Sequence, residues 1–355
     1  MSTTTSTPDS SESTLDSVKS YYGKVLQTNK DLQTSACCTA EALPVHLRAL
    51  AGEIHEEVQE KFYGCGSPIP HALEGATVVD LGCGSGRDSY MLSKMVGPKG
   101  RVIGVDMTKE QLAVAERHRD YHAKKFGYAS SNVRFVSGYI EDLASSGIES
   151  NSVDLVVSNC VINLSPDKRR VFSEIFRVLK PGGELFFSDV FSGRRVPQAL
   201  TKDATLLGEC LGGALYTQDF RRLMREVGCL DARIVTKRPI ELNNPEIVRM
   251  AGMIDFCSVT VRAFKLDLED VCEDYGQVAW YNGTIADSPH SFILDDHHVF
   301  RTGMPMLVCG NTAAMLAETR YRSHFRVIGD RSVHYGLFDC GPSPAAVAGA
   351  APACC

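Results

Sequence analysis

The stretch Val78–Gly86 reads Val-Val-Asp-Leu-Gly-Cys-Gly-Ser-Gly and predicts a buried strand that turns sharply into a helix. Gly82, Gly84 and Gly86 follow the apolar run at every second position. Glycine accepts positive φ angles and lets a backbone approach a ligand closely, and the next helix directs its unpaired N-terminal amides at the same point. The stretch therefore predicts a cradle for a small-molecule cofactor.

The residues that follow this turn predict the fold class. Apolar residues recur at helical spacing after Gly86, and a second apolar run, Arg101–Asp106, ends in an acid twenty residues beyond that glycine. In α/β nucleotide-binding folds a carboxylate at this position accepts hydrogen bonds from ribose hydroxyls, so we expect Asp106 to bind the cofactor. The alternation predicts an α/β protein with a Rossmann-like, mostly parallel sheet and helices on both faces. Further strands are expected at Val133–Ser137, Val153–Val157 and Glu184–Val190.

The composition is that of a folded protein and excludes several classes. With 355 residues, 44% of them hydrophobic, the chain is long enough for one large domain and a smaller one. Its net charge of -6 provides no basic excess for phosphates, which argues against nucleic-acid or membrane partners. The first eighteen residues contain no Lys or Arg, so they fit neither a secretory signal nor a transit peptide, and no apolar run is long enough to span a membrane. We therefore expect a cytoplasmic protein.

Changes in composition along the chain predict four segments. A disordered N-terminus is expected at 1–17 and a cofactor-binding domain at 18–240. Shorter alternating runs predict a small α+β domain at 241–335, and residues 336–355 are expected to form a flexible, Cys-containing tail.

The chain has thirteen cysteines, an odd number that cannot all be paired, so they do not form the disulfide framework of a secreted protein. Ligands of open α/β sheets bind beyond the carboxyl ends of the strands, so we expect Cys160, just after the fourth strand, to face the same crevice as Gly82 and Asp106. The other cysteines expected in loops are Cys37, Cys38, Cys65 and Cys210. Simple packing is expected of Cys229, Cys257, Cys272 and Cys309, and Cys83 is expected to serve only as a small residue in the turn.

The spacing of the loop cysteines narrows the kind of centre they would bind. Structural zinc needs four ligands, usually in Cys-x-x-Cys pairs, and the chain contains no such pair. Soft thiolates select soft centres, and trivalent arsenic is a soft, three-coordinate centre that keeps a lone pair.

The Gly-x-Gly-x-Gly turn with Asp80 before it resembles the S-adenosylmethionine-binding turn of Rossmann-like methyltransferases, which implies a sulfonium methyl donor held by the three glycines and Asp106. Further segments resemble the cysteine motifs of the arsenite methyltransferases. The resemblance runs in register from about Tyr21 to Tyr216 and more weakly to about residue 335. The segments are Tyr21–Leu26 with Cys37, Tyr63-Gly64-Cys65-Gly66, Ser158-Asn159-Cys160-Val161-Ile162-Asn163-Leu164 and Gly208-Glu209-Cys210-Leu211-Gly212-Gly213-Ala214-Leu215-Tyr216.

This resemblance implies that Cys65, Cys160 and Cys210 hold As(III), and that Cys37 pairs with Cys65 as a disulfide. Arsenic would be methylated once or twice, and thioredoxin or glutathione would reduce the disulfide that forms; no metal cofactor is expected. Cys38 and Leu207 depart from the family pattern. The further residues expected to contact the donor are Tyr63, Asp80, Met107, Ile140, Glu141 and Asn159.

Three alternatives remain open from the sequence. One is a methyltransferase acting on carbon or oxygen, which needs a proton acceptor; the available groups are His46, His55, His71 and Glu209. Another is a protein that binds As(III) without methylating it. Finally, His297 and His298 with Cys309 form either a separate metal site or, as we expect, a solvated loop.

Overall fold

The structure is a computed structural model that describes residues 10–26, 43–64, 66, 68–201 and 203–340. Five of the thirteen cysteines lie outside these residues, namely Cys37, Cys38, Cys65 and the two of the expected tail, Cys354 and Cys355.

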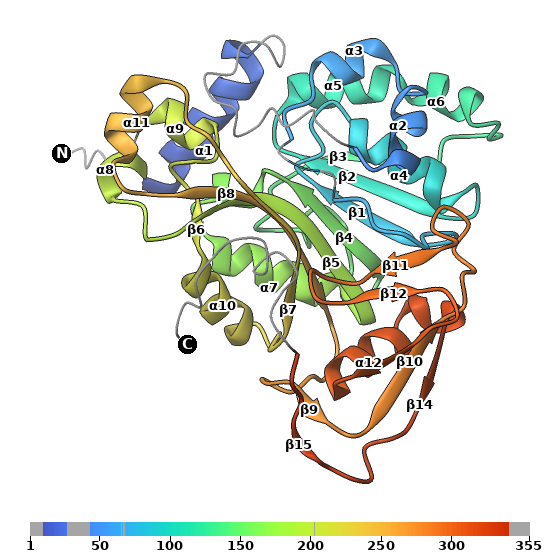
Figure 1. Cartoon of the computed structure of the whole chain (residues 1–355). Coiled ribbons are helices and arrows are strands. Elements are labelled where there is room, and N and C mark those ends of the chain that lie inside the picture. Colours follow the sequence, from blue (N-terminus) through green and yellow to red (C-terminus); the bar gives the residue numbers. More distant parts are fainter. Residues whose placement is uncertain (1–9, 27–42, 65, 67, 202, 341–355) are drawn as a thin grey trace, which may run out of the picture.

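A large, mostly parallel sheet forms the centre of the molecule (Figure 1). Its strand order is β3-β2-β1-β4-β5-β8-β7, and the first five of these strands run parallel to one another, whereas β8 is antiparallel to both of its neighbours. This confirms the predicted fold class. The strands are β1 (Thr77–Leu81), β2 (Arg101–Asp106), β3 (Val133–Ser137), β4 (Val153–Asn159), β5 (Leu179–Ser192), β7 (Ala232–Pro239) and β8 (Phe256–Phe264), with the short β6 (Leu215–Tyr216) paired to β5.

Helices cover both faces of this sheet because alternate residues of its strands point to opposite sides. On β1, Val78 packs in one core cluster with Met91 of α4, whereas Val79 packs in another with Phe172 of α7. The first face carries α2 (Val45–Ala51), α3 (Glu56–Glu60), α4 (Arg87–Val96), α5 (Lys109–Arg117) and α6 (Arg119–Lys125), and the second carries α7 (Lys168–Val178) and α10 (Thr217–Glu226).

A third cluster of helices sits at the end of the sheet where α1 and α11 appear in Figure 1. Its apolar core combines Val18 of α1, Leu206 of α9 and Ile247 of α11 with Cys160 and Cys210. The helices here are α1 (Ser10–Ser20), the π-helical turn η1 (Tyr21–Val25), α8 (Gln198–Thr201), α9 (Ala204–Gly208) and α11 (Pro245–Ala251), and the 3-10 turn η3 (Ile162–Leu164) lies near them.

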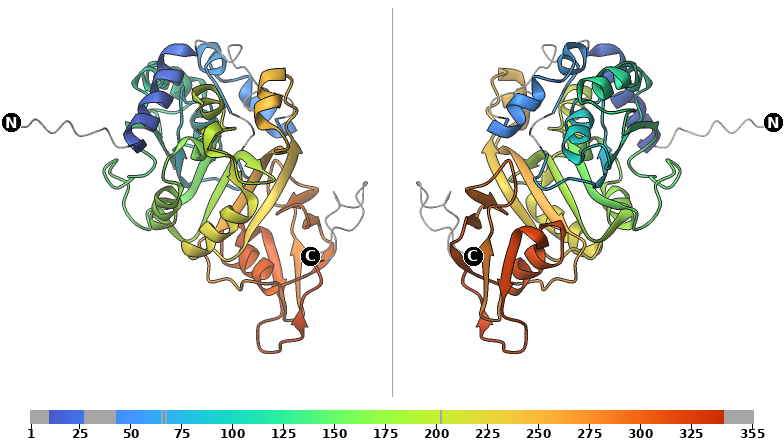
Figure 2. Two further views of the ribbon diagram at one scale, coloured as in Figure 1. Left: turned by 90° about the vertical axis from the view of Figure 1, so that its left-hand side faces the viewer. Right: turned by 90° about the vertical axis from the view of Figure 1, so that its right-hand side faces the viewer.

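The C-terminal part forms a small α+β unit at the opposite end of the molecule from α1 and α11, as both views of Figure 2 show. A buried ion-pair network joins it to the large sheet, because Glu184 of β5 pairs with Arg262 of β8 and with Arg320 of the small unit. Its elements are β9 (Glu273–Asp274), β10 (Gln277–Tyr281), β11 (Ser291–Ile293), β12 (Val299–Arg301), β13 (Pro305–Val308), α12 (Gly310–Ala317), η4 (Arg320–His324), β14 (Phe325–Ile328) and β15 (Gly336–Leu337).

Three expectations about the organisation need correction. Helix α1 begins at Ser10, so residues 10–17 are not disordered; Val18 at its end is 2% exposed and anchors the helix. The large sheet continues past residue 240, because β8 pairs with both β5 and β7. Residues 336 and 337 pair with β9 and so do not belong to a tail. Among the described residues, no helix combines the length and apolar character needed to cross a membrane.

Candidate functional site

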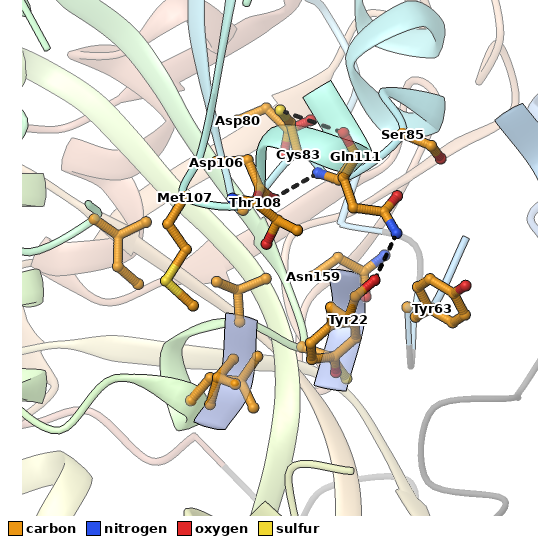
Figure 3. A pocket seen from close by; sticks show the side chains of 18 of the residues that line it. Tyr22, Tyr63, Asp80, Cys83, Ser85, Asp106, Met107, Thr108, Gln111 and Asn159 are labelled. Atoms are coloured by element: carbon orange, nitrogen blue, oxygen red, sulfur yellow. Dashed lines mark hydrogen bonds between the residues drawn. The ribbon is translucent and has the colours of Figure 1, made fainter. Parts of the chain in front are cut away.

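A cavity lies at the carboxyl ends of β1, β2 and β4, where ligands bind in open α/β sheets. The empty space in it, including its open mouth, amounts to about 900 Å³. Figure 3 shows Asp80 and Cys83 at one side of it and Tyr22, Tyr63 and Asn159 at the other. Of the residues expected to bind the donor, Gly86 does not line the cavity, whereas the following do: Tyr63, Asp80, Gly82, Gly84, Asp106, Met107, Ile140, Glu141 and Asn159.

The glycine turn shapes one wall of the cavity. Gly82, Gly84 and Gly86 have φ angles of 66°, 51° and 88°, which residues with a Cβ rarely adopt. A Cβ on Gly82 would approach Val161 to 2.4 Å, and one on Gly86 would approach Phe135 to 2.9 Å. Gly86 thus serves the packing of the turn, while Gly82 and Gly84 face the cavity.

Asp106 connects the end of β2 to the glycine turn. One of its carboxylate oxygens accepts a hydrogen bond from the backbone N–H of Gly84 at 2.9 Å, and the other accepts one from the N–H of Thr108 at 2.7 Å. Burial raises the pKa of Asp106. The acid therefore holds the turn in place at the position where the sequence predicts ribose recognition.

The cavity is lined by four acids, Asp80, Asp88, Asp106 and Glu141, against one cation, Lys61. Asp80 is 3% exposed and accepts a hydrogen bond from Ser89 Oγ at 2.5 Å. Burial and then the negative charge of Asp88 raise the pKa of Asp80 to about 7. Such a lining favours a cationic ligand, because a positive charge would relieve the repulsion among the carboxylates.

The side chain of Asn159 links β4 to the segment that precedes β1. Its Nδ2 donates to Gly66 O at 3.0 Å and to Asp88 Oδ2 at 2.8 Å, while its Oδ1 accepts from Gly66 N at 3.2 Å. A Cβ on Gly64 would lie 2.5 Å from Asn159 Nδ2, so a glycine is needed there. Tyr63 belongs to the same segment before β1 and lines the cavity, and its ring centroid lies 5.6 Å from that of Tyr22.

Cys160 and Cys210 meet at this site from distant parts of the chain. Cys210 Sγ donates to the carbonyl oxygen of Cys160 at 3.1 Å, and Cys160 lines the cavity. Both residues adopt positive φ angles, 57° and 64°, which are strained for residues with a Cβ and concentrate at functional sites. The structure has Cys160 in a disulfide.

A carboxylate and an ammonium group accompany these two cysteines. The ligand atoms of Cys160, Asp189 and Cys210 all lie within 4.8 Å of one another. Asp189 is fully buried, and this burial raises its pKa to about 7. Lys168 Nζ donates to the carbonyl oxygens of Asn163 at 3.1 Å and Ser165 at 3.0 Å, and its charge interacts with Asp189 and Cys210.

Two tyrosines of η1 form hydrogen bonds with the residues that precede Cys210. Tyr21 Oη donates to Glu209 Oε1 at 3.2 Å, and Tyr22 Oη donates to the carbonyl oxygen of Gly208 at 2.6 Å. Gln111 Nε2 in turn donates to the backbone oxygen of Tyr22 at 3.2 Å. The N-terminal segment thus connects the cofactor cavity to the residues around Cys210.

Sequence reasoning missed several of these residues. Asp189 offered a signal, since a charged residue stood inside an apolar strand. Asp88 and Lys168 offered none, because acids and lysines are ordinary on the exposed faces of helices. Among the residues that line the cavity, Tyr22, Ser85, Thr108 and Gln111 were also not foreseen.

The histidines considered as proton acceptors lie elsewhere. His46 Nε2 and His71 Nδ1 approach Asp287 Oδ2, at 3.7 and 3.0 Å, and the ring of His55 stacks on that of His118 at 3.8 Å. None of these histidines lines the cavity. The expectation of a solvated loop at His297 and His298 is wrong for His298, which is 5% exposed and hydrogen-bonded to buried Asp295.

Comparisons with known proteins agree on the kind of protein this chain resembles. A methyltransferase domain model matches residues 72–228, and a model of the arsenite methyltransferase C-terminal domain matches residues 275–336. An arsenite methyltransferase of Aquipseudomonas alcaligenes is 54% identical over 92% of this chain and 94% of its own length. The human arsenite methyltransferase is 44% identical over 88% of this chain and 84% of its own. An arsenic(III) S-adenosylmethionine methyltransferase of Chlamydomonas reinhardtii has a crystal structure that matches with a TM-score of 0.81 at 53% identity, covering 84% of this chain and 100% of that one.

Proposed function

The chain belongs to the arsenite methyltransferase family, and we propose that it transfers the methyl group of S-adenosylmethionine to trivalent arsenic held by its own cysteine thiolates. Methylated and dimethylated arsenicals are the proposed products. The observation that carries this proposal is the position of Cys160 and Cys210, which meet beside an acid-lined cavity at the carboxyl ends of the strands.

The cavity fits the methyl donor by its charge and by its backbone. S-adenosylmethionine carries a sulfonium and an ammonium group, and four carboxylates line the cavity. Gly82 and Gly84 would border the donor, Asp106 would accept from its ribose hydroxyls, and Ile140 and Glu141 would lie toward its adenine. When bound, the donor supplies an electrophilic methyl group.

The thiolates would hold the arsenic nucleophile on the other side of that methyl group. In this proposal Cys65 joins Cys160 and Cys210 as the third ligand, and three thiolates leave the arsenic lone pair unshared. The charge of Lys168 favours the ionised form of the Cys210 thiol. Because no proton leaves the arsenic, the reaction needs no general base at the acceptor, which agrees with a cavity lining that contains none of His46, His55 and His71.

Methyl transfer removes two electrons from arsenic, and two thiols return them as they form one disulfide. Cys37 and Cys65 are the proposed pair, and thioredoxin or glutathione would reduce it. The disulfide at Cys160 supports a need for reductant before As(III) binds, since a sulfur in a disulfide is not available as a thiolate.

The test is arsenic speciation after incubation of the protein with As(III), S-adenosylmethionine and a reductant. Wild type should yield methylated arsenic, and Cys160→Ser should not. Cys257→Ser is the matched control, because Cys257 is a free, half-buried thiol on β8 outside the cavity, and it should retain the activity.

The other outcomes contradict specific parts of the proposal. Equal activity in wild type and Cys160→Ser would remove Cys160 from the ligand set. If wild type binds As(III) but yields no methylated product, the chain is a binding protein. If wild type neither binds As(III) nor yields a product, an organic molecule is the better candidate for the methyl acceptor.

A further inference from the structure

Three side chains that can bind a metal ion meet where the small C-terminal unit contacts the N-terminal part of the chain. They are His46 on α2, His71 in the segment between α3 and β1, and Asp287 in the loop between β10 and β11. One ligand atom of each residue lies within 4.8 Å of those of the other two. We refer to these three residues as the His-His-Asp group.

The separations within this group suit a shared metal ion. His71 Nδ1 lies 3.0 Å from Asp287 Oδ2, and His46 Nε2 lies 3.7 Å from the same oxygen. Two ligands that bind zinc at about 2.0–2.1 Å lie roughly 3.4 Å apart when the site is tetrahedral. The two separations bracket this value, and the centroids of the imidazole rings are 4.6 Å apart. Small movements of the side chains would therefore let all three residues bind one ion.

The ring nitrogen of His46 that faces this group is shielded from solvent. Within the described part of the chain, His46 Nε2 has no hydrogen-bond partner. Most buried polar atoms have such a partner, because leaving one unpaired is destabilising. A metal ion would supply the missing interaction, since a neutral imidazole nitrogen is a common metal ligand.

The fold fixes the loop that carries Asp287. The side chain of Tyr281, at the end of β10, is fully buried beneath this loop. Its hydroxyl accepts a hydrogen bond from Ile285 N at 3.2 Å and donates one to Ser288 O at 2.7 Å. Asp287 therefore lies between two residues that the same tyrosine holds in place.

Contacts with the small unit also hold His71 in position. Arg320 Nε donates to the backbone oxygen of His71 at 3.1 Å, and the His71 ring centroid lies 6.2 Å from that of buried Phe292. The charge of Arg320 is balanced by its ion pair with Glu184. Two of the three ligands are thus positioned before an ion arrives, which lowers the cost of binding.

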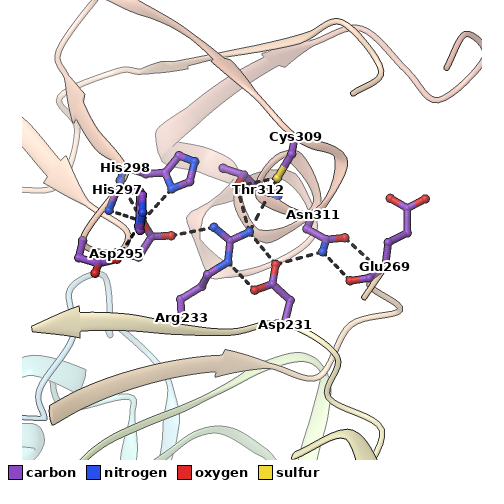
Figure 4. A network of polar contacts seen from close by, with 10 residues as sticks. Asp231, Arg233, Glu269, Asp295, His297, His298, Cys309, Asn311 and Thr312 are labelled. Atoms are coloured by element: carbon purple, nitrogen blue, oxygen red, sulfur yellow. Dashed lines mark hydrogen bonds and ion pairs between the residues drawn. The ribbon is translucent and has the colours of Figure 1, made fainter. Parts of the chain in front are cut away.

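A second cluster of possible ligands differs in its surroundings. One ligand atom from each of Asp295, Asp296 and His297 also lies within 4.8 Å of the others. Figure 4 shows the guanidinium of Arg233 directed at Asp295, and the Arg233 Nη1 to Asp295 Oδ2 distance is 3.0 Å. His298 Nδ1 contacts the other oxygen of Asp295 at 2.7 Å. A cation would be repelled by Arg233 there, so the His-His-Asp group is the better metal site.

We propose that the His-His-Asp group binds a divalent first-row transition metal, with zinc as the ion to be tested. The ligands are two imidazole nitrogens and one carboxylate oxygen, a donor set that suits zinc and iron(II). Water would complete the coordination, because the side chains of the group are partly exposed. His71 Nδ1 would exchange its hydrogen bond to Asp287 for a bond to the ion.

The ion would be structural and would take no part in methyl transfer. None of its three ligands lines the cofactor cavity. The ligands belong to α2, to the segment before β1 and to the small unit, so a bound ion would fasten the small unit to the N-terminal part of the chain. The proposed methylation does not depend on this ion, and the two proposals can fail separately.

The test measures zinc binding by the full chain after its accessible thiols have been alkylated with iodoacetamide, because free thiolates also bind zinc. In competition with a chromophoric chelator, wild type should bind one equivalent. His46→Ala, His71→Ala and Asp287→Asn should each weaken this binding at least about tenfold, since even the loss of an outer-shell partner costs about 10–100-fold. His297→Ala, in the second cluster, is the matched control and should bind zinc as wild type does.

Two further measurements exclude binding at thiols and effects of misfolding. The visible spectrum of bound cobalt(II) should lack a sulfur-to-metal charge-transfer band. Zinc should raise the unfolding temperature of wild type and of His297→Ala, but not that of Asp287→Asn, whose substituted side chain is exposed.

Three results would overturn the proposal. The first is that wild type binds no zinc, or binds it no more tightly than the three variants of the group do. The second is that His297→Ala loses the ion while His71→Ala keeps it, which would place the ion in the second cluster. The third is a cobalt spectrum with thiolate ligands.

Discussion

Two groups of cysteines, one beside the cavity and one in the small C-terminal unit, differ in backbone, charge and position. Cys160 and Cys210 have left-handed backbones, with φ of 57° and 64°, and share their surroundings with the buried carboxyl of Asp189. Cys309 has a relaxed backbone at φ -70° as a helix N-cap and faces the guanidinium of Arg233. Only the first group adjoins the cavity, through Cys160.

This difference indicates that a cysteine's role depends on its neighbours more than on the number of thiols near it. At the first group, two residues with strained backbones meet beside the proposed site of the methyl donor. At the second, a helix N-terminus and a fixed cation stabilise negative charge on one sulfur. The hydrogen bond from Cys272, followed by those from Thr312 and the charge of Arg233, lowers the pKa of Cys309 despite its burial. We therefore expect catalysis at the first group and no part in methyl transfer at the second.

The largest expected effect separates the two groups by activity. Cys210→Ser should lower the rate of arsenic methylation at least about a thousandfold, because positioning contributes roughly 7–11 kcal/mol in well-oriented reactions and serine is a poor ligand for a soft centre. Cys309→Ser should leave the initial rate within about twofold, since distant sites act independently. Initial rates from arsenic speciation check both values, with thermal unfolding as the control for folding. Similar losses in the two variants would contradict the division of roles.

The next effect concerns the acid that holds Arg233 at the second group. Asp295 is 1% exposed and accepts hydrogen bonds from His298 Nδ1 at 2.7 Å and from Arg233 Nη1 at 3.0 Å. Asp295→Asn should lower the free energy of unfolding by about 2 kcal/mol, because it removes one of the two carboxylates that pair with the buried guanidinium of Arg233 and leaves Asp231 alone to do so. Urea unfolding measures the change. Asp296→Asn, at the half-buried neighbouring position, should change it by less than about 0.5 kcal/mol; an equal loss there would show that the loop, and not the buried pair, is responsible.

The sequence allowed the first group to be predicted better than the second. The glycine turn, Asp106 and the end of β4 are local signals, because strand periodicity and glycine spacing are read within a few residues. Cys160 could be placed by the rule that ligands bind at strand ends. Cys210 was placed only by family resemblance, since nothing near it in the sequence indicates contact with Cys160.

The surroundings of Cys309 could not be predicted because its contact with Arg233 is non-local. Cys272 and Cys340 flank the paired two-residue strands β9 and β15, which are too short to give a periodic signal. Arg233 lies on β7 of the large sheet, so its contact with Cys309 depends on how the small unit packs. An apolar run before Cys309 therefore suggested packing alone.

A smaller effect tests the acid of the first group through pH. Burial raises the pKa of Asp189 from its usual 3.8 to about 7, so the folded state holds this proton more tightly than the unfolded state does. Its contribution to stability should therefore fall as the pH rises from about 4 to 7, by about 1–2 kcal/mol once relaxation of the site is allowed for. Asp189→Asn should remove this part of the pH dependence, whatever its effect at a single pH. Denaturant unfolding at pH 5 and pH 8 measures it for both proteins.

The comparison with Asp295 gives this prediction its control. Burial acts to raise the pKa of Asp295, yet the hydrogen bond and charge of His298 and the charge of Arg233 outweigh it and lower that pKa. Asp295 therefore stabilises the fold above the usual pKa of an aspartate, and this contribution is lost only as the pH falls below it. A pH dependence between 5 and 8 that persists in Asp189→Asn and is absent in Asp295→Asn would reverse the assignment of the two acids.

The smallest expected effect concerns the thiolate of the second group. Thr312 contacts Cys309 Sγ through both its backbone N–H, at 3.4 Å, and its hydroxyl, at 3.3 Å. Thr312→Val keeps the backbone contact and the shape but removes the hydroxyl, so it should raise the pH midpoint of Cys309 alkylation by up to about one unit, the equivalent of one hydrogen bond. Peptide mass spectrometry across a pH series gives the midpoint. Cys257, which lacks these contacts, should show the same midpoint in both proteins. An unchanged midpoint for Cys309 would mean that Cys272 and Arg233 alone stabilise its negative charge, and the comparison between the two groups would then depend on those two residues.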